Sequence, residues 1–116
     1  MQNQTPQAVQ AAHELLVWLI PQLDKLPRAR RFTLGERLET GVLAILENLI
    51  EAAYTHDKEK ALQQANLRLD IVRHLWPAAH ELRLIPIRRY EEGARLFDDL
   101  GRQIGGWLKS RRSARL

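Results

Sequence analysis

The apolar residues of this chain recur at steps of three and four along nearly its whole length, and no stretch alternates strictly between apolar and polar residues. Such steps place side chains on one face of an α-helix, whereas strict alternation is typical of a β-strand. The pattern therefore predicts an all-α chain with four amphipathic helices. The four apolar stripes consist of Val9, Ala12, Leu16, Leu19, Leu23 and Leu26; of Leu34, Leu38, Val42, Ile45, Leu49 and Ala53; of Leu62, Ala65, Leu69, Val72, Trp76 and Ala79; and of Tyr90, Ala94, Phe97, Leu100, Ile104 and Trp107.

Residues that favour helix ends indicate where the first two helices begin and end. The first helix is expected from about Gln7 to Leu26, because Pro27 disfavours helical backbone in the residue before it. Thr33 and Glu36 have the spacing of a capping box, in which each side chain accepts a hydrogen bond from the backbone N–H of the other residue. The second helix is therefore expected to begin near Leu34.

The last two helices carry similar signals. Asp57 is a candidate N-cap of the third helix, and Pro86 suits the first position of the fourth, where its missing N–H is not needed. Pro21 and Pro77 lie inside the first and third helices and are expected to kink them. Each predicted helix has about 20 residues and is therefore about 30 Å long.

The matched helix lengths and short connections favour an antiparallel up-down-up-down four-helix bundle. A length of 116 residues suggests a single domain over residues 1–116, with a short polar N-terminus and a basic C-terminal tail. The tail, residues 110–116, contains three arginines and no acid, and it is expected to fray beyond the last helix.

The chain has more apolar surface than one bundle can bury. Residues 15–20 are apolar all round a helix, although a bundle buries only one face of each helix, and Leu84 adds apolar surface at the third corner. A homo-oligomer is therefore predicted; the alternative is that Trp18 and its neighbours fill a wide core. The residues expected at the interface between subunits are Leu15, Val17, Trp18, Ile20, Ile85 and Ile87.

Three glycines fall inside the predicted fourth helix, at Gly101, Gly105 and Gly106. Each glycine in a helix interior costs about 1 kcal/mol relative to alanine, so their presence needs a reason. The expected reason is the close approach of another backbone, within the bundle or between subunits, with Trp107 packed beside the gap.

The residue patterns of common active sites are missing. The chain has no cysteine, and no glutamate is followed three residues later by the histidine that di-iron bundles use. The only serines, Ser110 and Ser113, lie in the tail, and no Gly-x-Ser-x-Gly turn or phosphate-binding glycine loop is present. The sequence therefore predicts a protein that is not an enzyme and that holds neither a metal nor another cofactor.

The sequence also lacks the signals of export and of membrane insertion. The first ten residues are polar and uncharged, and the longest apolar run, residues 15–20, is too short to span a bilayer. Together with the absence of cysteine, these features predict a cytoplasmic protein with no membrane partner.

The positive charge is carried mainly by arginine, which supplies 14 of the 18 basic residues against 14 acidic ones. Arginine binds phosphate through two parallel hydrogen bonds, although a GC-rich genome would also raise its frequency. In an antiparallel bundle, the corner with Arg28, Arg30 and Arg31 would lie beside Arg88 and Arg89 and form a basic rim that attracts polyanions. The alternative is a charged surface without a ligand. The predicted nucleic-acid-binding residues are Lys25, Arg28, Arg30, Arg31, Arg68, Arg73, Arg88, Arg89, Lys109, Arg111 and Arg112.

Three segments, in this order and spacing, resemble the Avd family, the accessory variability determinants of diversity-generating retroelements. They are PRARRFTLGERLE from residue 27, ALQQANLRLDIVRHLWPAAHEL from residue 61, and LGRQIGGWLKS from residue 100. The glycines followed by Trp107 in the third segment are the most specific part. The resemblance implies a basic homopentamer of four-helix bundles, without a catalytic centre, that binds a reverse transcriptase and RNA, and possibly DNA, during mutagenic cDNA synthesis.

The resemblance also implies a role for one residue of the third helix. Arg73 lies in the segment where the family has basic residues implicated in binding reverse transcriptase and nucleic acid. Other members can carry a second base one turn later, where this chain has Pro77, which shifts the expected binding toward the first corner. Two alternatives remain: a bundle protein of the ribosomal RNA intervening-sequence type, and a scaffold for an acidic protein partner.

Overall fold

The computed structural model describes residues 6–114 and contains four long helices in that range, without a strand. The long helices are α1 (Gln7–Leu23), α3 (Glu36–Tyr54), α4 (Lys58–Glu81) and α5 (Ile87–Ala114). Two short segments precede α3: α2 (Arg28–Arg30) and η1 (Arg31–Gly35), a π-helical turn. The prediction of an all-α chain with four amphipathic helices is confirmed.

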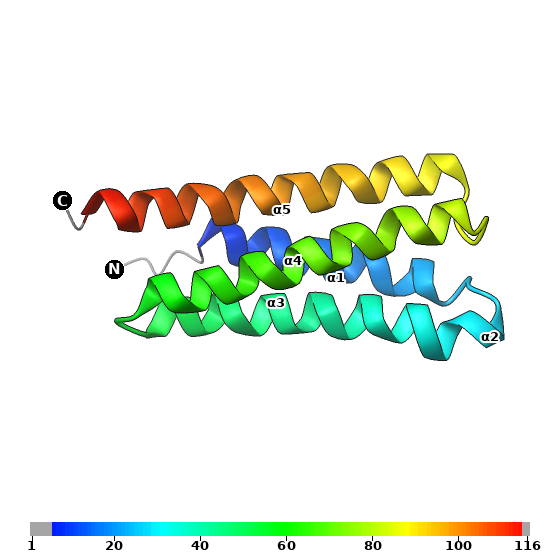
Figure 1. The fold of residues 1–116 in the computed structure, drawn as a ribbon, viewed down its shortest axis with the longest axis horizontal. Coiled ribbons are helices and arrows are strands. Elements are labelled where there is room, and N and C mark those ends of the chain that lie inside the picture. Colours follow the sequence, from blue (N-terminus) through cyan, green and yellow to red (C-terminus); the bar gives the residue numbers. More distant parts are fainter. Residues whose placement is uncertain (1–5, 115–116) are drawn as a thin grey trace.

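The helices lie side by side in an elongated molecule of 48 × 27 × 22 Å. Consecutive long helices run in opposite directions along the long axis (Figure 1). Both α3 and α5 contact α1 and α4. This arrangement places the connection from α1 to α3 and the turn from α4 to α5 at one end of the molecule, and the turn from α3 to α4 at the other.

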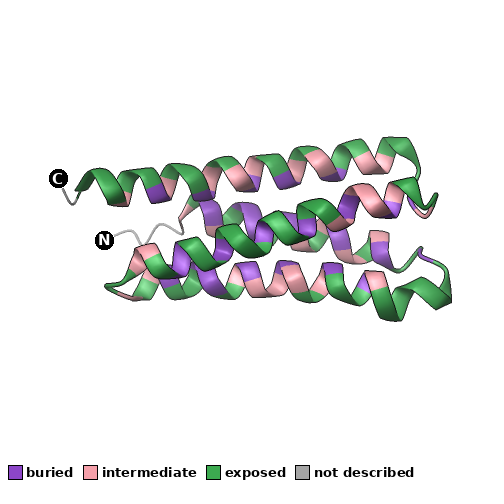
Figure 2. Ribbon diagram, in the orientation of Figure 1, coloured by how far each residue is buried: buried purple, intermediate pink, exposed green. Residues whose placement is uncertain are grey.

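The core runs along the centre of the bundle, where buried residues of all four long helices face one another (Figure 2). Most of the predicted apolar stripes lie in it. In α1, however, the buried face is centred on Leu15 and Leu19 rather than on Leu16, which is only partly buried. Where a helix is apolar all round, the sequence does not indicate which face is buried. Packing against α3 and α5 determines the buried face of α1.

Two of the six predicted interface residues are instead part of this core. Leu15 is 0 % exposed and Ile85 is 2 % exposed within a single chain, so neither has surface left for a partner, and that prediction is wrong for both. Trp18 and Ile20 are half-buried, while Val17 and Ile87 are exposed.

An aromatic cluster around Trp76 lies in the part of the core nearer to the turn between α4 and α5. The ring centroid of Trp76 lies 5.8 Å from that of Trp18, 5.7 Å from that of Phe97 and 6.5 Å from that of Tyr90. Its indole Nε1–H donates a hydrogen bond to the Tyr90 carbonyl at 2.9 Å. Trp18 therefore packs partly into the core, in line with the alternative that it and its neighbours fill a wide core.

The capping box predicted for Thr33 and Glu36 does not form. The Thr33 hydroxyl instead donates to the carbonyls of Ala29 and Arg30, at 3.4 and 3.3 Å. The backbone is already helical from Arg28, so the N–H groups at the start of α3 find carbonyl partners in η1 and need no side-chain cap.

Other helix ends differ from the prediction by a few residues. The first helix ends at Leu23, not at Leu26, and α5 begins at Ile87, directly after Pro86. Asp57 is at the N-cap of α4 but makes no side-chain capping hydrogen bond there. The tail does not fray where expected, because α5 continues to Ala114; Arg115 and Leu116 lie outside the described residues.

Candidate nucleic-acid interface

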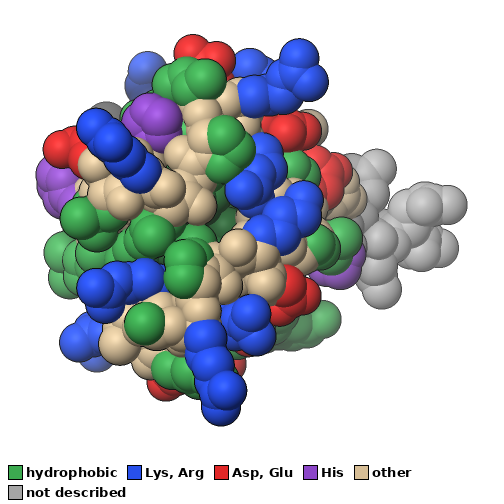
Figure 3. All heavy atoms as spheres, turned by 90° about the vertical axis from the view of Figure 1, so that its right-hand side faces the viewer, with side chains coloured by type: hydrophobic (Ala, Val, Ile, Leu, Met, Phe, Trp, Pro, Cys, Tyr) green, Lys and Arg blue, Asp and Glu red, His purple; other side chains and the backbone are tan. Residues whose placement is uncertain are grey.

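The basic residues at one end of the molecule come from two connections that are far apart in the sequence and from the first turns of the helices that follow them. Residues 24–35, between α1 and α3, and residues 82–86, between α4 and α5, lie at the same end of the long axis. Figure 3 views this end directly and shows lysine and arginine side chains spread over it. We call it the basic end, and it consists of Lys25, Arg28, Arg30, Arg31, Arg37, Arg83, Arg88 and Arg89.

The four bases contributed by the connection from α1 to α3 are all exposed. Arg31 Nη2 donates a long hydrogen bond of 3.5 Å to the Leu26 carbonyl. Lys25, Arg28 and Arg30 have no side-chain hydrogen bond or ion pair within residues 6–114. Their charges are therefore available to an external anion.

The bases contributed by the start of α5 differ from one another. Arg88 is exposed, whereas Arg89 Nη1 donates to Gln22 Oε1 at 3.1 Å and thereby links α5 to the end of α1. Carboxylates such as Glu36 and Glu81 also lie at the basic end, but no ion pair within the described range involves one of its bases.

Two residues of the basic end, Arg37 and Arg83, are not among the bases predicted from the sequence. Arg83 has a φ of 62°, in the left-handed region. The Leu84 N–H donates to the Ala79 carbonyl at 3.0 Å and the Arg83 N–H to the His80 carbonyl at 2.8 Å, which is the hydrogen-bond pattern of a Schellman helix end. Glycine is usual at this position because a Cβ costs about 1 kcal/mol there. The bundle thus holds an arginine where its backbone favours glycine.

Replacing Arg83 with glycine is expected to raise the free energy of unfolding by about 0.5–1 kcal/mol, because it removes the Cβ from a left-handed backbone. The same change should weaken binding of a polyanion, since one charge of the basic end is lost. Urea denaturation at a fixed protein concentration measures the first effect. Arg88→Gly is the control: it places glycine in right-handed helical backbone and should lower stability. A destabilised Arg83→Gly variant would contradict this account of the turn.

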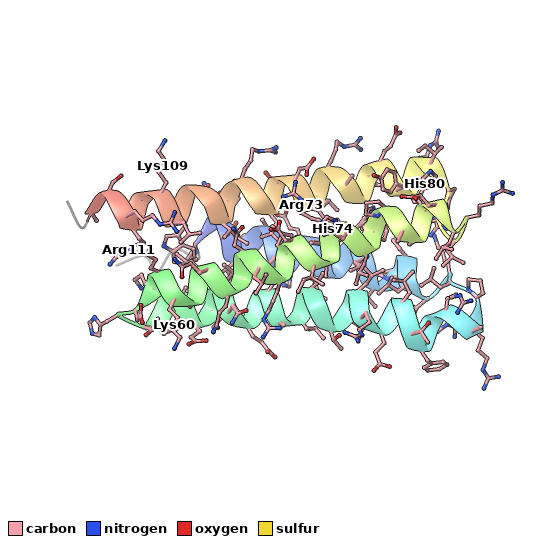
Figure 4. All side chains as sticks on the ribbon, viewed as in Figure 1. Lys60, Arg73, His74, His80, Lys109 and Arg111 are labelled. Atoms are coloured by element: carbon pink, nitrogen blue, oxygen red, sulfur yellow. The ribbon has the colours of Figure 1, made fainter. Side chains whose placement is uncertain are left out.

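Arg68 and Arg73 lie midway along α4. Figure 4 shows Arg73 away from the basic end. Arg73 Nη2 forms an ion pair of 2.6 Å with Asp98 Oδ1 of α5. A Cβ added to Gly101 would lie 3.0 Å from Arg73 Nη1, so the glycine lets the guanidinium lie against α5. The close neighbour of Gly101 is therefore an arginine side chain and not another backbone, and Arg73 is already partly neutralised within its own chain.

Lys109, Arg111 and Arg112 lie close to the end of α5. Figure 4 shows Lys109 and Arg111 near the opposite end of the molecule. The stretch of α5 between Arg89 and Lys109 is about 30 Å long. Arg112 Nε forms an ion pair of 3.3 Å with Glu59 Oε2. The predicted bases thus fall into three places: the basic end, the middle of α4 and the C-terminal end of α5.

The histidines do not assemble into a metal site in the part of the chain that the structure describes, where no group of three or more potential metal-binding side chains is found. His80 Nδ1 lies 2.8 Å from the Ile85 carbonyl, and its ring stacks on Tyr90 at 4.8 Å (Figure 4). This histidine therefore supports the turn between α4 and α5. No helix between residues 6 and 114 has the length and hydropathy needed to cross a membrane.

Comparison with known proteins agrees with the resemblance seen in the sequence. A family model described as bAvd-like matches residues 7–111, which include α1, α3, α4 and most of α5. A search of curated proteins found no match. The family match spans all three segments that resemble Avd proteins, and the chain therefore belongs to the bAvd-like family.

Proposed function

We propose that this protein is a non-enzymatic accessory subunit of a diversity-generating retroelement, which binds the template RNA or its cDNA together with the reverse transcriptase. Membership of the bAvd-like family supports a role among retroelement components. The observation that carries the nucleic-acid part is the cluster of Arg28, Arg30 and Arg31, three exposed guanidinium groups without a carboxylate partner in residues 6–114.

The proposed mechanism is electrostatic. Guanidinium groups of the basic end contact phosphates, which position a nucleic acid without reading its sequence. The polymerase binds an adjacent surface of the same subunit and is held close to the template. In this proposal the protein supplies no reacting group and acts in the cytoplasm.

A homopentamer, as the family resemblance implies, would repeat the basic end five times and raise the local positive potential. Val17 and Ile87 are exposed apolar residues that suit an interface between subunits, and Trp18 and Ile20 have part of their surface free. A Cβ added to Gly105 or to Gly106 would meet nothing within 4 Å, so any close approach at these glycines would come from another subunit.

Binding of single-stranded RNA is expected to weaken steeply as salt increases, because phosphate contacts release counterions. Six contacts correspond to a slope of about −4 in log affinity against log salt concentration. Fluorescence anisotropy between about 50 and 200 mM salt measures this slope. A flat response would contradict phosphate binding. A reverse-transcriptase gene beside this one, and co-purification of its product with this protein, test the polymerase part. If neither is found, the alternative is a protein of the intervening-sequence type.

A further inference from the structure

A groove beside the basic end has an exposed aromatic ring at its edge. It has a volume of ≈ 580 Å³ and lies between η1, the start of α3 and the end of α4. Phe32 is 66 % exposed and Leu82 is 61 % exposed, so both present apolar surface to solvent. The residues that line the groove are Arg30, Phe32, Thr33, Leu34, Glu36, Arg37, Thr40, Ala78 and Leu82.

The Phe32 side chain contributes little to the stability of the folded chain. Complete burial of a phenylalanine side chain stabilises a protein by about 1.5–3 kcal/mol, and most of this ring stays in water. It belongs to the π-helical turn Arg31–Gly35, a type of distortion found frequently at functional sites. The exposed ring therefore adds little to the stability of the fold and is available to contact a ligand.

The charges around the groove favour an anionic ligand. Arg30 and Arg37 both line it, against a single carboxylate from Glu36, and Arg28 and Arg31 adjoin it in the sequence. An aromatic face flanked by guanidinium groups is the arrangement with which proteins bind single-stranded nucleic acid: unpaired bases stack on the ring while arginines contact the phosphates. In a duplex the faces of the bases are covered by their neighbours and cannot reach such a ring.

We propose that this groove binds an unpaired nucleobase of a single strand, stacked on Phe32, with the flanking phosphates held by Arg30 and Arg37. The inference rests on the proposed function and adds a preference for single strands over duplex. Ala78 and Leu82 of the same groove add apolar surface that the edge of the stacked base can contact.

Replacing Phe32 with alanine tests the proposal. Stacking contributes about 1–3 kcal/mol per base, so the variant should bind a single strand of about ten nucleotides at least fivefold more weakly. Affinity for the matching duplex should stay within about twofold, and the salt slope should not change because no charge is removed. Titrations with RNA and DNA versions of the strand show which sugar the protein prefers. A loss of affinity for either version in Phe32→Ala supports binding of a base in the groove.

Tyr54→Ala is the matched control, because Tyr54 is an exposed aromatic residue at the opposite end, where the turn from α3 to α4 lies. This variant should bind the single strand as the wild type does. Phe32→Trp should retain the affinity, and its added indole fluorescence should be quenched when a base stacks on it. These two variants separate stacking from a general loss of exposed aromatic surface.

Three outcomes would overturn the proposal: unchanged single-strand affinity in Phe32→Ala, an equal loss for single strand and duplex, or a change in assembly size by light scattering. The last would mean that Phe32 contacts another protein chain. If the wild type binds no nucleic acid, the proposed function itself fails. If it binds through the arginines and Phe32→Ala keeps full affinity, only the groove proposal fails.

Discussion

Replacing Arg28, Arg30 and Arg31 together with glutamate is expected to weaken binding of single-stranded RNA about 100-fold or more at low salt. The three guanidinium groups are exposed and have no carboxylate partner in residues 6–114, so each is free to contact a phosphate. Their loss should also reduce the steepness of the salt dependence by about 2 for each protomer that contacts the RNA. Anisotropy titrations at several salt concentrations measure both effects.

A matched control changes the net charge by the same amount elsewhere. Lys60, Arg95 and Arg102 are exposed, lie outside the basic end and are not among the predicted binding residues. Their combined replacement with glutamate should affect RNA binding much less, and both variants should keep wild-type helicity and assembly size. Equal losses in the two variants would show that net charge, rather than the basic end, determines affinity.

Replacing Trp76 with alanine is expected to lower the free energy of unfolding by about 3–5 kcal/mol. Its side chain is 1 % exposed and its ring packs among Trp18, Tyr90 and Phe97, so the substitution opens a cavity between α1, α4 and α5. It also removes the hydrogen bond from the indole to the Tyr90 carbonyl. Urea denaturation at a fixed protomer concentration measures the change, since assembly would make stability depend on concentration.

Gly93 provides a sharper test of the same packing. A Cβ added there would lie 2.5 Å from Trp76 Cζ2, so Gly93→Ala should lower the free energy of unfolding by about 1–3 kcal/mol in the wild type. In the Trp76→Ala background the methyl group has space, and the same substitution should have little effect or be favourable. If the two destabilisations simply add, the two residues do not pack as described.

The helices could be predicted from the sequence because apolar spacing is a local property. Leu38, Ile45, Leu69, Phe97 and Leu100 lie in the predicted stripes, and all are buried. Helix ends were less predictable: the Thr33 and Glu36 spacing met the rule for a capping box, yet the preceding residues are already helical and satisfy the same N–H groups.

The candidate site was predicted in part. Clusters such as Arg28–Arg31 and Arg88–Arg89 stand out along the sequence, and their expected proximity follows from helices that reverse direction. Arg83 stands alone between leucines, and Arg37 sits in a helical stretch beside an acid, so neither gave a signal. That Phe32 shares a groove with Leu82 could not be predicted either, because fifty residues separate them.

By itself, the sequence determined the number of helices, the apolar face of most of them, the surplus of arginine and the family, because each depends on the kind and spacing of neighbouring residues. The tertiary structure alone decided that Leu15 is buried while Val17 is exposed, that Arg73 is neutralised by Asp98, and that Arg83 adopts left-handed backbone at the basic end. These outcomes depend on which helices meet and in what register, and that is set by packing among side chains distant in the sequence.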